Sequence, residues 1–180
     1  MSTIRLLLAA VVLASFAGCQ RASSTETKVP VTVHVSAGSP LVKLTKGDEK
    51  TLAALIAAHK GQVIFVDYWA TWCHPCVEYF PHTVEMNRKY KERGLATIAV
   101  SFDDPSDESA PRDFLAKQGA DFENLLSSYD PGPAAFEGFG IDLVPHFRLY
   151  DRKGQLRHKW DAQPGDADEK IVALLAEKGD

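Results

Sequence analysis

Two cysteines separated by two residues, Cys73-His74-Pro75-Cys76, are the residues of this 180-residue chain whose spacing points most directly to chemistry. They stand where the apolar run 62–69 gives way to a helical pattern. A pair with this spacing at a helix start can close a small disulfide ring and reopen it. The unpaired N–H groups and the positive dipole end of the helix would stabilise a thiolate on Cys73, while Cys76 lies one turn deeper. We therefore expect Cys73 to be a nucleophile and Cys76 to be the thiol that resolves its mixed disulfide.

Two other uses of this cysteine pair stay open. It could be half of a structural zinc site, although no second CxxC and no HxxxH follows it. It could also be a static disulfide, which the exposed strand-to-helix location disfavours. His74 either favours the thiolate as a cation or is a solvated, neutral imidazole, and Glu78 is expected to be a surface charge of the helix.

Further candidates flank the pair. Asp67 lies inside the apolar run, where an unpaired carboxylate is costly and its pKa should rise, unless it faces solvent at a strand edge. Trp72 fits core packing or substrate contact. The acidic segment 103–111 is expected to be a solvated connection. The remaining histidines show no ligand spacing and are expected at the surface: His34, His59, His82 and His158.

The elements that must position these residues follow a strand–helix–strand–helix order, then a hairpin and a last helix. Such an order predicts an α/β domain with a parallel βαβ unit and an added antiparallel pair. Its 45% hydrophobic and 24% charged residues are an ordinary globular balance for one domain. Strands are expected at 29–35, 41–44, 62–69, 95–102, 146–150 and 155–160, helices at 48–59, 73–93, 112–118 and 166–178, and one or two helical turns within 132–140.

The first 28 residues have a different composition from the rest. Arg5 precedes the apolar run 6–17, which is long enough for an export signal and too short to span a membrane. Phe16-Ala17-Gly18-Cys19 looks like a bacterial lipobox, which implies cleavage before Cys19 and a lipid on its sulfur. An ordinary secretory signal with a chance cysteine is the alternative. We expect a signal peptide at 1–18, a lipidated tether at 19–28, a folded domain at 29–180, and a location on the bacterial envelope facing the periplasm.

Charge and cysteine content exclude other classes. A net charge of -4 leaves no electrostatic footprint for nucleic acid, and three cysteines are too few for a disulfide scaffold.

The chain resembles the thioredoxin superfamily, and within it the exported, membrane-tethered thiol–disulfide oxidoreductases of the TlpA/ResA type. The resemblance covers roughly residues 43–178: the segment 66–76 resembles the active-site signature, Pro81 the helix-kinking proline, and Val144-Pro145 the cis-proline before a strand. It implies a thioredoxin fold, in which a central mixed sheet (βαβ plus antiparallel ββα) is flanked by helices and carries a short N-terminal strand extension.

The same resemblance implies roles and partners. Asp67 would relay protons for Cys76, and the substrate surface would comprise Trp72, His74, Pro75, Val144 and Pro145. Such proteins act without a cofactor, as monomers, on protein thiols and disulfides. The implied direction is reduction, for instance of apocytochrome c, with electrons from a membrane-bound thiol reductase.

Two other classes compete with this interpretation. His146 follows Pro145 where relatives commonly carry threonine, so Cys73, Cys76 and His146 could hold copper in a chaperone of the Sco type. Those proteins place three residues between their cysteines, whereas this chain has two. A peroxidase of the peroxiredoxin kind would need a Thr-x-x-Cys setting, which Thr71-Trp72-Cys73 does not match.

Overall fold

A mixed β-sheet with helices on both faces forms the centre of the computed structural model, which describes residues 42–177. All of these residues belong to one compact unit. The strand order is β1-β4-β3-β2-β5-β6; the first four strands are parallel to one another, and β5 is antiparallel to both β2 and β6. The strands are β1 (Leu44–Gly47), β2 (Val63–Trp69), β3 (Leu95–Ser101), β4 (Glu123–Ser127), β5 (His146–Tyr150) and β6 (Leu156–Trp160).

The helices begin and end at residues suited to those positions. Asp48 forms a capping box with Thr51 at the start of α1, and Gly94, in the left-handed conformation, follows the 3-10 turn that continues α2. The helices are α1 (Glu49–Ala58), α2 (His74–Tyr90) with the 3-10 turn η1 (Lys91–Arg93), α3 (Ser109–Gln118), α4 (Pro133–Phe139) and α5 (Ala167–Ala176).

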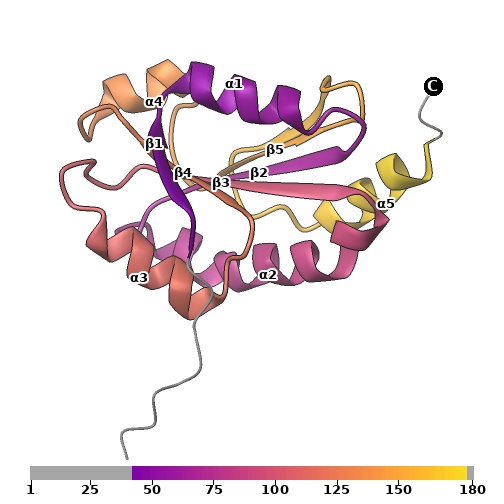
Figure 1. The fold of residues 1–180 in the computed structure, drawn as a ribbon, viewed down its shortest axis with the longest axis horizontal. Helices are drawn as coiled ribbons and strands as arrows, with labels where there is room; N and C mark the ends of the chain where they lie inside the picture. Colours follow the sequence, from indigo (N-terminus) through magenta and orange to yellow (C-terminus); the bar gives the residue numbers. More distant parts are fainter. Residues whose placement is uncertain (1–41, 178–180) are drawn as a thin grey trace, which may run out of the picture. The chain divides into compact units, whose positions relative to one another are not determined.

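Alternating residues of β2 face two separate parts of the core. Val63 and Phe65 pack with residues of α2 and α5, whereas Ile64 and Val66 belong to the cluster that includes Leu52 of α1. Figure 1 shows α1 and α4 on one face of the sheet and α2 and α3 on the other. All seven residues of β2 are buried, as a continuous apolar run predicts for a central strand. The segment that leads into Cys73 is therefore anchored on both faces.

The sequence interpretation is confirmed for the α/β class, the mixed sheet and most elements, and it was wrong at three places. The strand expected at 41–44 is instead β1 at Leu44–Gly47, because its pairing with β4 runs over those four residues. Strand β4 was missed because Glu123–Ser127 is short and has no β-branched residue; its pairing with both β1 and β3 makes it a strand. Helix α3 starts at Ser109 rather than at residue 112, since Pro111 lies in the first turn, where a missing N–H costs nothing. The expected strand at 29–35 and Cys19 lie outside the described residues. Within residues 42–177, no helix combines the length and apolarity needed to cross a membrane.

Candidate active site

Cys73 and Cys76 form a disulfide at the amino end of α2. Cys73 is the N-cap residue, and its carbonyl accepts the first helical bond from the N–H of Val77 at 3.0 Å. The N–H of Cys76 points to Sγ of Cys73 at 3.3 Å. This backbone donor and the helix dipole both favour negative charge on that sulfur once the bond is reduced. The exposed fractions are 6% for Cys73 and 2% for Cys76, which agrees with an outer nucleophile and an inner resolving thiol.

The residues around the pair differ in exposure. The side chain of Trp72 is 60% exposed, so it does not pack in the core and is free to contact a partner. His74 is also exposed, with Nδ1 3.6 Å from the Glu78 carboxylate one turn along. Pro75 stands in the first turn of α2, where it costs no hydrogen bond. The surface beside the disulfide is therefore open and carries an indole and an imidazole.

Asp67 is buried in the middle of the sheet beneath α2. It pairs with Ala99 of β3 on one side and Phe147 of β5 on the other, which excludes the strand-edge alternative. Its Oδ2 accepts a 2.7 Å hydrogen bond from Oγ1 of Thr83. Burial raises the pKa of Asp67 to about 7, and the Thr83 hydroxyl opposes that rise.

Helix geometry places Asp67 and Cys76 on the same side of the sheet. Cys76, Tyr79 and Thr83 recur at helical spacing and so share one face of α2. The Thr83 hydroxyl bonds to the Asp67 carboxylate, so this face of α2 packs over Asp67. Asp67 therefore lies beneath the face of α2 that carries Cys76, and its carboxyl group has a pKa near neutrality.

The peptide bond between Val144 and Pro145 is cis, as the resemblance implied. Pro145 leads directly into β5, whose His146 pairs with Tyr68 of β2. Since β2 continues into the Cys73 turn, the cis-proline and the disulfide lie at the same edge of the sheet.

His146 is buried and both of its ring nitrogens have partners. Nδ1 lies 2.8 Å from Oδ1 of Asp161, and Nε2 accepts from Nε of Arg148 at 3.2 Å. Burial, the largest effect, lowers the pKa of His146. An imidazole held in this way offers no free nitrogen to a metal. Among residues 42–177, no three His, Cys, Asp or Glu side chains are grouped to hold a metal ion, so the structure does not assemble the copper site considered above.

Two contacts of the site were not found by sequence reasoning. Nε2 of Gln163, in the segment after β6, donates to the carbonyl of Pro75 at 3.1 Å. Asp103, expected in a solvated loop, is instead buried and bonds to Thr71, two residues before Cys73. Asp103 stands two residues after β3, which pairs with β2. A polar residue just beyond a buried strand that neighbours β2 was the available signal.

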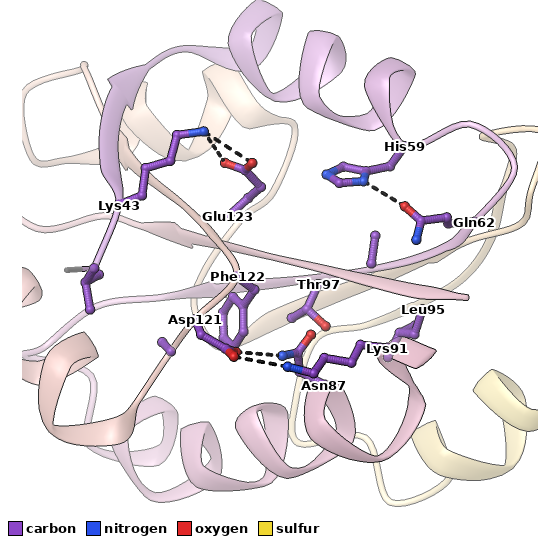
Figure 2. Close-up of a pocket in the computed structure, with 13 residues that line it drawn as sticks. Lys43, His59, Gln62, Asn87, Lys91, Leu95, Thr97, Asp121, Phe122 and Glu123 are labelled. Carbon is purple, nitrogen blue, oxygen red and sulfur yellow. Dashed lines mark hydrogen bonds and ion pairs between the residues drawn. The ribbon is translucent and has the colours of Figure 1, made fainter. Parts of the chain in front are cut away.

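A pocket of about 430 Å³ lies elsewhere in the fold (Figure 2). Its lining includes Leu95 and Glu123, the first residues of β3 and β4, whereas Cys73 follows the carboxyl end of the parallel strand β2. The pocket is thus at the opposite edge of the sheet from the disulfide. Figure 2 shows the side chains of Asn87 and Lys91 both directed at Asp121 and that of His59 directed at Gln62. The hydrogen bonds to Asp121 are 3.0 Å from Asn87 and 3.1 Å from Lys91.

Comparison with known proteins identifies the family to which the chain belongs. The Redoxin family model matches residues 27–174. The thiol-disulfide oxidoreductase ResA of Bacillus thuringiensis (strain Al Hakam) is 31% identical over 97 residues, which are 54% of this chain and 53% of the relative. The ResA protein of Bacillus subtilis (strain 168) is 26% identical over 122 residues, or 68% and 65% of the two chains. The chain therefore spans about half the length of the first of these curated relatives.

Solved structures agree with the fold. A Chlorobium tepidum protein assigned as the thiol:disulfide interchange protein DsbE is 29% identical, with a TM-score of 0.57 over 67% of this chain and 85% of that one. A thiol-disulfide isomerase from Corynebacterium glutamicum, 20% identical, has a TM-score of 0.60 over 78% and 99% of the two chains. The second likeness concerns the fold alone.

Proposed function

Because the chain belongs to the Redoxin family, we propose that it is a thiol–disulfide oxidoreductase that exchanges the Cys73–Cys76 pair with thiols and disulfides of proteins. The observation that carries the proposal is the disulfide at the start of α2, with the N–H of Cys76 directed at Sγ of Cys73. A static structural disulfide does not need its outer sulfur at a helix N-cap, whereas a reversible one gains a stabilised thiolate there.

The proposed reaction passes two electrons to the substrate. The Cys73 thiolate attacks one sulfur of a substrate disulfide, and the second substrate sulfur leaves as a thiolate. Asp67 accepts the proton of the Cys76 thiol, and the resulting thiolate attacks Sγ of Cys73. The substrate is released with both sulfurs reduced, and the Cys73–Cys76 disulfide is restored. The reverse sequence would oxidise a substrate dithiol.

Substitution of single cysteines tests this proposal. In an insulin-reduction assay with dithiothreitol, Cys73→Ala should abolish activity. In a separate incubation with insulin, after dithiothreitol has been removed from the reduced protein, Cys76→Ala should accumulate a mixed disulfide visible on non-reducing gels. Cys19→Ala is the matched control, because it removes a cysteine outside the redox pair and should retain activity. Full activity of Cys73→Ala, or no adduct with Cys76→Ala, contradicts the roles given to the two cysteines.

We further propose that the protein works as a reductant on the periplasmic face of the bacterial inner or outer membrane, held there by lipid on Cys19. The support is the sequence: Arg5, the apolar run 6–17 and the lipobox-like segment ending at Cys19. Its substrates would be exported thiol proteins such as apocytochrome c, and a membrane-bound thiol reductase would supply electrons to a monomer. Fractionation tests the tether: Cys19→Ala should move the protein from the membrane to the soluble fraction, and retention on the membrane contradicts it.

A further inference from the structure

The turn between β2 and α2 is held by a side chain from outside it. Within the turn, the N–H of Cys73 donates to the carbonyl of Ala70 at 3.2 Å. The N–H of Thr71 points outward, and both carboxylate oxygens of Asp103 lie 3.1 Å from it. The N–H of Phe102 donates to the carbonyl of Trp69 at 2.8 Å, which is the backbone bond between these two segments just beyond β3. The bond between Asp103 and Thr71 follows it and joins the same two segments once more.

The Asp103 carboxylate is buried, and hydrogen-bond donors surround its two oxygens. The residue is 5% exposed, and its oxygens accept from three neutral donors: the N–H and hydroxyl of Thr71 and the hydroxyl of Ser101, the last at 2.6 Å. The backbone N–H of Asp103 in turn donates to Oγ of Ser101 at 3.1 Å. A carboxylate can accept from all three donors, whereas an amide of the same shape has one acceptor oxygen and two N–H donors of its own.

The turn connects this carboxylate to the reactive sulfur. Thr71 is two residues from Cys73, and Cys73 must start α2 in the orientation that places Sγ 3.3 Å from the N–H of Cys76. Short segments without helical or strand pairing need such side-chain bonds to keep one conformation. Displacement by about 1 Å would weaken the contact on which the thiolate depends.

We propose that Asp103 is a positioning residue: through Thr71 it holds the turn 70–73 so that Sγ of Cys73 faces the amino end of α2. The inference rests on the proposed function, because it assigns Asp103 a part in making the nucleophile of that reaction. Asp103 acts through the turn and does not touch the substrate.

The test is the alkylation rate of Cys73 in the reduced full chain, measured with iodoacetamide from pH 6 to 9 and resolved from Cys76 by peptide mass spectrometry. Asp103→Asn and Asp103→Glu should each slow alkylation at pH 7 about tenfold, the equivalent of one unit in the thiol pKa. Removal of a nearby negative charge would by itself speed the reaction, and Asp103→Glu retains the charge. Slowing in both variants therefore reports position rather than charge. Asp104→Asn is the matched control, because Asp104 is exposed and should leave the rate unchanged.

Folding is checked by circular dichroism and by amide exchange, where the Thr71 N–H should exchange faster in both Asp103 variants. A folded Asp103 variant that reacts within twofold of the wild type overturns the proposal. If neither variant folds, Thr71→Val decides: it keeps Asp103 and removes one donor, and a slowing of about threefold supports the proposal while an unchanged rate overturns it. A wild-type Cys73 that reacts no faster than an ordinary thiol contradicts the proposed function instead, so the two failures are distinguishable.

Discussion

Replacing Asp67 with asparagine should stabilise the oxidised protein at alkaline pH far more than at acidic pH. Burial raises the pKa of Asp67 from 3.8 to about 7, so the folded state holds this proton more tightly than the unfolded state does. The contribution of Asp67 to stability is thus fully present below pH 3.8 and is lost as the pH rises through about 7. A rise of about 3 units in the pKa of Asp67 corresponds to about 4 kcal/mol in the free energy of unfolding. Roughly 3 kcal/mol of this stabilisation is lost between pH 5 and pH 8.

Urea unfolding of the wild type and Asp67→Asn at pH 5 and pH 8 measures this difference. Asparagine can still accept the Thr83 hydroxyl, and any cost of its unpartnered NH₂ group is the same at both pH values. The free energy of unfolding of the variant relative to the wild type should therefore increase by about 3 kcal/mol from pH 5 to pH 8. Asp113→Asn, which alters an exposed carboxylate of α3, is the control and should shift by less than about 0.5 kcal/mol. An equal effect of Asp67→Asn at both pH values would refute a buried carboxyl group that titrates near neutrality.

Three other substitutions test separate parts of the account. Thr83→Val removes the hydroxyl that opposes the raised pKa of Asp67. The pH midpoint for resolution of the mixed disulfide by Cys76, followed by stopped flow, should therefore move about one unit alkaline, and an unchanged midpoint would exclude Asp67 as the base. Trp72→Ala removes a 60% exposed indole beside the cysteine pair. It should lower kcat/KM for a protein disulfide at least threefold, or about 0.7 kcal/mol, and leave kcat/KM for a small disulfide unchanged. Equal losses on both substrates would argue against contact between Trp72 and a protein substrate. Phe80→Ala removes a fully buried ring that packs on Trp69 and Phe114. It should lower the free energy of unfolding in urea by about 3–5 kcal/mol, and a decrease under about 1 kcal/mol would contradict this packing.

The parts of the site that sequence predicted are those fixed by local pattern. The continuous apolar run of β2 and the helical spacing after Cys73 placed the cysteine pair at a strand-to-helix junction. The same run favoured a buried Asp67 over one that faces solvent at a strand edge. The resemblance supplied the cis-proline at Pro145, which composition alone could not reveal.

The parts that sequence missed depend on contacts between distant segments. Asp103 meets Thr71 across 32 residues and Gln163 meets Pro75 across 88, and neither lies in a periodic pattern. A run of acidic residues is typical of a solvated loop. Only the structure reveals that Thr71 and Ser101 donate hydrogen bonds to Asp103, the first carboxylate of this run. Strand β4 was missed for the same reason, since Glu123–Ser127 is a strand only because β1 and β3 flank it.

The redox equilibrium of the Cys73–Cys76 pair is the most direct measurement of the central claim. The folded protein is equilibrated in thiol–disulfide buffers of graded potential, its free thiols are trapped by alkylation, and they are counted by mass spectrometry. We predict one reversible two-electron transition with a midpoint between about -270 and -120 mV, while circular dichroism reports a folded chain throughout. A disulfide that stays closed to below about -300 mV, or that opens only when the protein unfolds, would contradict the account and identify the pair as a structural cross-link.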